Sequence, residues 1–369
     1  MPNFDQTAAP DSLQVPIEEI VAVALEYKAS DIHFKAGQPP VFRIDGQLTT
    51  FPGLPAFSAE NLTAALMGLL NRRQHKLFEE TLELDAALVF PGKARVRLNI
   101  YHDVEAIGCA MRIVPLRVPT LEELGMPPII EKLTHLRSGL VLVCGVTGAG
   151  KSTTLASMVN EINRREAVHI YTIEDPIEYL HTPIRSVITQ REVGFSTKTF
   201  STAVRASLRA DPNVLLIGEM RDPETMMAAL KAAETGLLVL TTLHTTSATK
   251  TIQRVLGIFD PKEQEAVRMQ LAYSLRAVVC QQLVPLVEGG RKAFHEIMVT
   301  TSTVQEAILY GDFDKLQEYI KNGSYEEMCA MDDSIYKAYC DGLIDSHAAK
   351  DYSLNKDEME RILRGAILS

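Results

Sequence analysis

The stretch "GVTGAGKST", residues 145–153, matches the pattern G-x-x-x-x-G-K-[ST] in full. It follows the apolar run "GLVLVCG" (139–145) and precedes a segment with helical spacing, which is the strand–loop–helix context that the pattern requires. Glycines let such a loop curl until several backbone N–H groups point at one phosphate, and the dipole of the next helix adds to the attraction. A chance glycine-rich turn is the alternative interpretation. We predict a phosphate-binding loop that binds ATP and Mg²⁺.

The residues of this loop have distinct expected contacts. Lys151 would reach the β- and γ-phosphates, and the hydroxyl of Ser152 would hold Mg²⁺. The predicted nucleotide-binding residues are Gly145, Thr147, Gly148, Ala149, Gly150, Lys151, Ser152 and Thr153.

Three more short apolar runs follow the loop, and helical patterns separate them. They are "AVHIYTIED" (167–175), "NVLLIGE" (213–219) and "LLVLTTLH" (237–244). Continuous rather than alternating apolar strands indicate a sheet that is buried on both faces, which is typical of a parallel α/β domain. From about residue 260 onward the chain is predicted to be mostly helical. We therefore expect an α/β domain over residues 129–369.

The first part of the chain has a different pattern of apolar residues and turn signals. A helical pattern begins near residue 16, an alternating segment with turn signals (30–50) predicts a hairpin, and a second helix is expected around 58–79. Three further strands are predicted at 82–90, 94–103 and 106–114. We expect a disordered lead at 1–14, a small α+β domain at 15–114, and a proline-containing linker or hinge at 115–128.

Two glutamates end strands of the predicted sheet. Glu174 closes one apolar run, and Glu219 follows Gly218 at the end of the next. The usual pattern has an aspartate where Gly218 stands, so Glu219 is the nearest carboxylate for the metal, partly through water. Hydrolysis also needs a group that orients and deprotonates water, and Glu174 is our candidate. The alternative is that both carboxylates are only solvated strand ends. Parallel strands bring their carboxyl ends to one edge of the sheet, which favours the catalytic interpretation.

His244 stands in "TTLHTTSATK" (241–250), among several hydroxyl side chains and directly after an apolar run. By itself this segment could be a strand that ends in a polar loop. Beside a phosphate-binding loop, a neutral imidazole could donate to phosphate or bind the catalytic glutamate. We predict that His244 distinguishes ATP from ADP.

Arginine side chains can neutralise the negative charge that develops on the γ-phosphate oxygens during phosphoryl transfer. Arg205 and Arg209 have i, i+4 spacing and are predicted to lie on one helix face. In the first domain, Arg95 and Arg97 alternate along one strand and Arg112 lies on the next. Each of these could be a surface charge. Together they suggest that the first domain, with Arg97 and Arg112, contributes to a nucleotide site of its own or a neighbouring subunit.

Composition limits the classes of function. A formal net charge of -10 disfavours nucleic-acid binding, which needs a positive field. No apolar run approaches the roughly 20 residues that span a bilayer, and the N-terminus lacks the features of a secretory signal. The chain has 5 cysteines and no CxxC pair, which fits a reducing cytoplasm and indicates neither a zinc knuckle nor a disulfide framework.

The combined motifs resemble the PilT group of secretion and type IV pilus ATPases. The similarity begins at "ASDIHF" (29–34) and includes the Walker A segment "GVTGAGKSTTLASMVNEIN" (145–163). "YTIEDPIEY" (171–179) is similar to the Asp box, "LRADPNVLLIGEMRD" (208–222) to the atypical Walker B, and "AAETGLLVLTTLHTTSA" (232–248) to the His box. Assembly ATPases typically carry extra N-terminal domains and a four-cysteine zinc site, and from the length and the lack of CxxC pairs we expect neither here. The chain therefore resembles the retraction (PilT/PilU) branch.

The resemblance implies a homohexameric ring of two-domain subunits that hydrolyses ATP to ADP and phosphate. Each subunit would have a PAS-like N-terminal domain and a RecA-like ATPase domain, with Glu174 as general base, Glu219 serving Mg²⁺ and water, and His244 as the His-box residue. It also implies docking on an inner-membrane pilus platform protein at the cytoplasmic face, possible pairing with a paralogous retraction ATPase, and no nucleic-acid partner. The segment "TVQEAILYGD" (303–312) departs from the family, which usually has two arginines there, and puts the motor's output in question.

Two rival functions fit parts of the sequence. A ring-shaped nucleic-acid translocase would share the nucleotide motifs, but the net charge of -10 argues against it. A non-motor regulator that binds nucleotide and signals through partners would also keep the loop, and the absence of turnover in an assembled hexamer would favour it.

Overall fold

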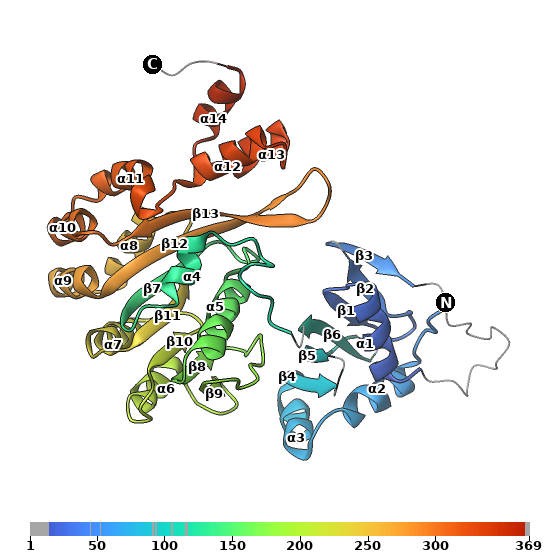
Figure 1. Ribbon diagram of the computed structural model, residues 1–369. Coiled ribbons are helices and arrows are strands. Elements are labelled where there is room, and N and C mark those ends of the chain that lie inside the picture. The colour runs from blue at the N-terminus through green and yellow to red at the C-terminus, as the bar shows by residue number, and fades with distance from the viewer. Residues whose placement is uncertain are drawn as a thin grey trace. The chain divides into compact units, whose positions relative to one another are not determined.

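The computed structural model describes residues 15–365 apart from residues 45, 52, 91, 93, 105, 115 and 116. The expected disordered lead at 1–14 lies outside the described residues, as do Pro115 and Leu116 of the expected linker. The chain forms two compact units, Met1–Arg117 and Val118–Ser369 (Figure 1).

The first unit is built on a six-stranded antiparallel sheet with the strand order β3-β2-β1-β6-β5-β4. Alternate residues of β5 show why it forms, since Val96, Leu98 and Ile100 are buried on one face while Arg97 on the other face is exposed. The strands are β1 (Asp31–Phe34), β2 (Val41–Ile44), β3 (Gln47–Thr50), β4 (Glu83–Phe90), β5 (Ala94–His102) and β6 (Ile107–Val114).

Three helices share a single apolar core with this sheet: α1 (Ile17–Glu26), α2 (Ala59–Gly68) and α3 (Arg72–Thr81). Ser58 caps α2, and Asn71 with Gln74 forms a capping box at the start of α3. The single helix expected at 58–79 is therefore two helices, because Asn71 caps the start of a second helix within this range. The α+β character and the strands at 82–114 agree with the prediction.

The second unit has a seven-stranded sheet with the order β13-β12-β7-β11-β10-β8-β9. All neighbouring pairs from β12 to β9 are parallel, and β13 is an antiparallel edge strand. The strands are β7 (Gly139–Cys144), β8 (His169–Glu174), β9 (Val187–Glu192), β10 (Val214–Ile217), β11 (Leu238–Leu243), β12 (Leu275–Pro285) and β13 (Arg291–Val299). The four parallel strands predicted from the apolar runs are confirmed.

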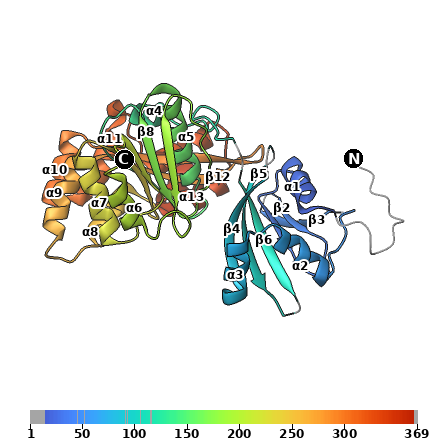
Figure 2. The ribbon, with the colours of Figure 1, turned by 90° about the horizontal axis from the view of Figure 1, so that it is seen from below.

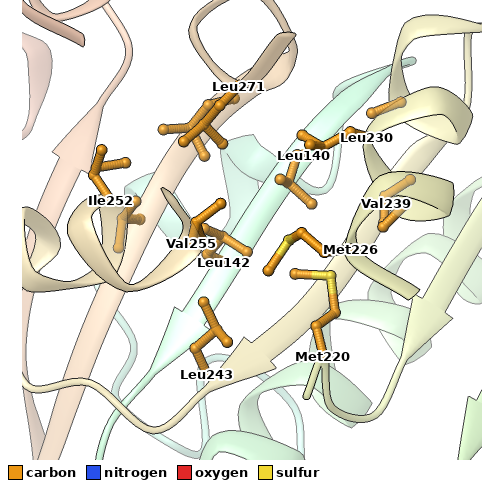
Figure 3. Close-up of a cluster of buried hydrophobic side chains, with 14 of the residues drawn as sticks. Leu140, Leu142, Met220, Met226, Leu230, Val239, Leu243, Ile252, Val255 and Leu271 are labelled. Atoms are coloured by element: carbon orange, nitrogen blue, oxygen red, sulfur yellow. The ribbon is translucent and has the colours of Figure 1, made fainter. Parts of the chain in front are cut away.

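The sheet of the second unit is buried on both faces, as the continuous apolar runs require. On one face Leu140 and Leu142 pack with α7 and α8 residues, and Figure 3 shows this cluster. On the other face Val141 and Val143 pack with α4 and α5, which lie on the opposite side of the sheet in Figure 2. The helices around the sheet are α4 (Pro128–Leu133), α5 (Lys151–Arg165), α6 (Phe200–Ser207), α7 (Pro223–Glu234), α8 (Ala248–Leu256), α9 (Gln264–Ser274), α10 (Ser302–Tyr310) and α11 (Phe313–Asn322).

The prediction of a mostly helical chain from residue 260 is wrong for residues 275–299, which form the β12–β13 hairpin. Val278 and Val279 of β12 are fully buried on opposite faces and pair with β7. A strand that is apolar on both sides does not alternate, so its pattern cannot be distinguished from that of a buried helix. Beyond the hairpin the chain is helical, with α12 (Met331–Cys340), α13 (Ser346–Tyr352) and α14 (Lys356–Leu363) packed around residues of β12 and β13.

The expected linker at 115–128 is shorter in the structure. Residues from Val118 onward belong to the second unit, and Leu121 and Met126 pack against its core beside α4. The prolines of this segment predict a connection between domains. The apolar side chains between the prolines instead pack against the core of the second unit. In the described part of the chain, no helix is both long and apolar enough to cross a membrane.

Candidate active site

The loop between β7 and α5 carries the phosphate-binding motif at the carboxyl edge of the parallel sheet. Its first residue, Gly145, has φ 147°, in a region that disfavours side chains. A Cβ there would lie 2.4 Å from the backbone oxygen of Gln281 on β12, closer than packing allows. Only glycine therefore lets β7 turn into the loop beside β12.

Gln281 fastens the loop from the side. Its Nε2 donates to the backbone oxygen of Ala149 (2.5 Å), and its Oε1 accepts from the hydroxyl of Thr154 on α5 (2.9 Å). The side chain is buried, so both bonds are shielded from water. This residue was missed in the sequence because 275–299 was predicted to be helical.

Lys151 is the first residue of α5 and is buried inside the loop. Its Nζ donates to the backbone oxygens of Gly145 (2.8 Å) and Val146 (3.2 Å). Burial lowers the pKa of this amine, and nearby negative groups oppose that effect. The ammonium is therefore held where the loop backbone converges.

His244 lies between Lys151 and Glu219. Its Nδ1 is 3.5 Å from Nζ of Lys151, and its Nε2 is 3.3 Å from Oε1 of Glu219. An ammonium can only donate, so Nδ1 is the acceptor, and Nε2 carries the proton that it donates to the carboxylate. The residue that begins the polar loop after β11 thus joins Lys151 to Glu219.

Glu219 has a second partner, because Arg221 donates to its Oε2 at 2.6 Å. Burial alone would raise the pKa of Glu219, but the hydrogen bond and charge of Arg221, with the hydrogen bond from His244, outweigh it and lower the pKa below its usual value. The carboxylate is therefore ionised over a wide pH range. Arg221 was not singled out in the sequence, although it stands in the "GEMRD" segment (218–222).

Glu174 ends β8 and is held by its neighbours on one oxygen. Thr172 donates to Oε1 at 2.7 Å, Gln190 of β9 donates to the same oxygen at 3.3 Å, and the backbone N–H of Glu178 reaches Oε2 at 3.4 Å. Burial raises the pKa of this carboxyl, while these hydrogen bonds act in the opposite direction. A raised pKa is one property required of a general base, the role expected for Glu174.

Gly218, where the usual pattern has an aspartate, lies close to Glu174. A Cβ on Gly218 would lie 3.3 Å from Cα of Glu174 and 3.4 Å from the backbone oxygen of Ile173. The backbone oxygen of Gly218 also accepts from the hydroxyl of Thr242 on β11 (2.6 Å). β10 therefore passes close to β8 at this point, where a larger side chain would press on Glu174.

The residues present fit a magnesium ion bound with nucleotide. Ser152, in the first turn of α5, and Glu219 offer the hydroxyl and carboxylate oxygens that this hard cation prefers. Among the described residues there is no group of three or more His, Cys, Asp or Glu side chains that could hold a metal, so phosphate oxygens would complete the coordination. Thr153, the next residue, shares a 3.0 Å hydrogen bond with the hydroxyl of Tyr179.

Arg205 and Arg209 do not lie on one helix face as predicted. α6 ends at Ser207, and Pro212 disfavours helical backbone just before it, so Arg209 falls in the turn that follows. Nδ1 of His169, the first residue of β8, donates to the carbonyl of Ala210 in that turn (3.0 Å). The turn is thus at the amino edge of the sheet, opposite the phosphate-binding loop. Arg205 is exposed and pairs with Glu224 of α7 (3.1 Å).

The arginines of the first unit lie on neighbouring strands. Arg97 of β5 is paired in register with Arg112 of β6. Nε of Arg112 donates to Asp31 of β1 at 2.9 Å. Arg95 is buried although it shares a strand face with the exposed Arg97. Arg97 and Arg112, the two arginines of the first unit expected at a nucleotide site, therefore lie opposite each other on adjacent strands of that unit.

Comparisons with known proteins identify the family of the chain. Residues 7–309 match the family described as Type II/IV secretion system protein. The chain is 42% identical over 335 residues to the type IV pilus retraction ATPase PilT of Pseudomonas aeruginosa, which covers 91% of this chain and 97% of the relative. It is 36% identical to the type IV pilus ATPase PilU of the same species, over 89% of this chain and 86% of the relative. A crystal structure of the pilus retraction motor PilT with bound ADP superposes with a TM-score of 0.88 at 38% identity, covering 94% of this chain and 100% of that one.

Proposed function

We propose that the chain, which belongs to the Type II/IV secretion system protein family, is an ATP-hydrolysing motor that powers type IV pilus retraction. The resemblance to PilT-type retraction ATPases is confirmed by the relatives. The observation that carries the proposal is the contact of His244 with both Lys151 and Glu219 at the phosphate-binding loop. That arrangement links triphosphate binding to the carboxylate that serves the metal.

Binding would place the β- and γ-phosphates against the loop backbone and the ammonium of Lys151. The amine would exchange the carbonyl oxygens of Gly145 and Val146 for phosphate oxygens. Mg²⁺, when bound, would neutralise charge on the phosphate oxygens, with Ser152 and Glu219 holding it. Thr147, Gly148, Ala149, Gly150 and Thr153 complete the proposed cradle.

Glu174 would orient a water molecule and take its proton as the water attacks the γ-phosphate. Its raised pKa makes it a stronger base than an exposed glutamate. His244, which donates to Glu219 in this structure, could donate to a γ-phosphate oxygen instead. Loss of the γ-phosphate would return that bond to Glu219, and His244 would thereby report the difference between ATP and ADP.

The motor would be a homohexamer with nucleotide between subunits. The first unit, whose antiparallel sheet and helices are consistent with a PAS-like domain, would close on a neighbouring RecA-like ATPase domain and open after hydrolysis. The junction of the two units at Arg117 and Val118 is the proposed hinge, and Arg97, Arg112, Arg205 and Arg209 are the proposed charges that act across the interface. Force would pass to an inner-membrane pilus platform protein at the cytoplasmic face, with a paralogous retraction ATPase as a further partner and no nucleic acid involved.

ATP turnover measured together with mass by light scattering tests the proposal. Wild type should assemble into a hexamer that hydrolyses ATP, and Glu174→Gln should assemble and bind ATP but lose turnover by roughly 100- to 10,000-fold. Persistent turnover in the variant would exclude Glu174 as the base. A wild-type hexamer that binds ATP without hydrolysis would instead support a nucleotide-binding regulator.

A further inference from the structure

The side-chain amide of Gln190 on β9 makes three hydrogen bonds, one of them to Glu174. Its Nε2 donates to Oε1 of Glu174 (3.3 Å) and to the backbone oxygen of Tyr179 (2.9 Å). Its Oε1 accepts from the backbone N–H of His181 (2.9 Å). An amide offers two donors and an acceptor, and all three functions are engaged here. One side chain therefore holds both Glu174 and the segment that follows β8.

The segment 175–181 has further anchors on both sides. The backbone N–H of Ile177 donates to the carboxylate of Glu192 on β9 (3.0 Å). The hydroxyl of Tyr179 meets that of Thr153, in the first turn of α5, at 3.0 Å. Thr153 directly follows Ser152, the proposed magnesium ligand. The segment thus spans from the phosphate-binding helix to the edge strand that carries Gln190.

The two oxygens of Glu174 are held unequally. Oε1 receives the hydrogen bonds from Thr172 (2.7 Å) and Gln190 (3.3 Å), whereas Oε2 has only the long contact from the N–H of Glu178 (3.4 Å) among the hydrogen bonds of the described residues. An oxygen that already accepts two hydrogen bonds is a poor proton acceptor. Oε2 is consequently the oxygen of Glu174 that can take a proton from water.

We propose that Gln190 is a positioning residue for hydrolysis: it fixes the carboxylate of Glu174 so that Oε2 faces the attacking water, and it couples that orientation to the 175–181 segment docked on α5. The inference rests on the proposed function, in which Glu174 is the general base. Gln190 itself touches neither nucleotide nor water in this role. It acts through Glu174 and the backbone of Tyr179.

The test compares ATP turnover of the full chain with Gln190→Leu, which keeps the volume and removes all three hydrogen bonds. Misplacing a catalytic group by about 1 Å can cost on the order of 100-fold in rate, so we expect kcat to fall roughly 10- to 100-fold. KM for ATP, binding of ADP and the assembled mass should stay unchanged. Gln253→Leu, the same change at an exposed position of α8, is the matched control and should keep the wild-type kcat.

A pH profile separates positioning from loss of structure. The hydrogen bond from Gln190 lowers the pKa of Glu174, against burial and the nearby charge of Glu178, so its removal should move the acid limb of kcat to higher pH. The other charged or titratable groups near this edge include Glu192, opposite Glu174 in register, and Glu219 with its partners Arg221 and His244. Asp175, next to Glu174, and Lys151 also lie there. Gln190→Glu is isosteric and keeps an acceptor for the backbone N–H of His181. This variant should shift the acid limb of the kcat profile to still higher pH.

The outcomes are distinct. A lower kcat with an unchanged KM and a shifted acid limb supports the proposal. Wild-type kcat and pH profile in a folded Gln190→Leu or Gln190→Glu overturn it while leaving the motor function intact. A fall in kcat that accompanies loss of assembly or ADP binding, with no shift of the acid limb in Gln190→Glu, also overturns it, since that result describes a structural residue. Undiminished turnover in Glu174→Gln overturns both the base assignment and the role of Gln190.

Discussion

Nε2 of His244 donates to Oε1 of Glu219 across 3.3 Å, while Nδ1 of the same ring accepts from Lys151 at 3.5 Å. The ring is therefore fixed in one tautomer by a cation on one side and an anion on the other. Both contacts come from side chains for which we propose separate roles toward phosphate and metal. Any ligand that takes Lys151 or Glu219 must change what His244 binds.

His244→Ala should slow or uncouple ATP hydrolysis and leave the fold intact. The side chain is 44% exposed, so its removal creates no closed cavity and should shift the thermal midpoint only slightly. Turnover and thermal unfolding measured together check this, with His347→Ala on α13 as a control at an exposed histidine. An unchanged rate combined with a large loss of stability would assign His244 a structural role.

Lys151→Ala should weaken ATP binding by roughly 10- to 100-fold, because a hydrogen bond to a charged group contributes about 1.5–3 kcal/mol. The ammonium is the cation that the loop holds at its centre. Titration calorimetry with ATP measures the effect, and Lys231→Ala at an exposed position of α7 is the control. Equal affinity in both variants would show that the loop backbone binds phosphate without this amine.

Gln281→Ala should weaken nucleotide binding and also destabilise the second unit. It leaves the buried backbone oxygen of Ala149 and the hydroxyl of Thr154 without their partner, and each such group costs about 1–3 kcal/mol. Thermal unfolding with and without ADP measures both effects. Gln282→Ala, at the next and less buried position of β12, should leave both near wild type. A loss of equal size in the two variants would contradict a specific clamp.

Glu174→Gln should make the folded protein more stable at neutral pH. Burial raises the folded-state pKa of Glu174, so its stabilising contribution is complete below the unfolded pKa and is lost as pH rises through the folded pKa. At pH 7.5 the ionised carboxylate therefore costs stability that a neutral amide does not. The thermal midpoint should be higher in the variant at pH 7.5, and the difference should shrink toward pH 4. Exposed Glu234→Gln should show no such pH-dependent gain.

His295 should make the protein lose stability in mild acid. Burial, with the charge of Lys292, lowers its pKa to about 4, from 6.5. A histidine whose pKa is lowered in the folded state stabilises the fold at pH values above its unfolded pKa. This stabilisation, about 3 kcal/mol for His295, is lost as pH falls from 6.5 toward 4. Urea unfolding across that pH window should show a shallower decline in His295→Leu. An identical slope would mean that the pKa of His295 is the same in the folded and unfolded states.

The parallel sheet and the phosphate-binding loop were predictable because each depends on local order in the chain. Leu140 to Cys144 and Leu215 to Ile217 form unbroken apolar runs, and the loop glycines have fixed spacing. Glu174 and His244 followed from their places at the ends of such runs. Their proximity to other side chains depends on strand order, which the sequence alone does not specify.

The partners of the site were harder to predict. Gln190 meets Glu174 only because β9 pairs with β8 in a particular register, and β9 itself carries no strong apolar run. Gln281 was hidden in a segment whose apolar residues suit a helix as well as a strand. Arg209 was misplaced since the effect of Pro212 on the end of α6 was not considered. Long-range pairing decided the cases of Gln190 and Gln281, and a local proline effect decided that of Arg209.

The clamp between Gln281 and Ala149 joins residues that are 132 positions apart in the chain. During synthesis the phosphate-binding loop leaves the ribosome long before the strand that fastens it. A product that terminates before residue 281 would have the complete nucleotide motif but an unsecured loop. We therefore expect truncated chains to bind ATP poorly, and occupancy by nucleotide would mark the subunits whose synthesis has passed the β12–β13 hairpin.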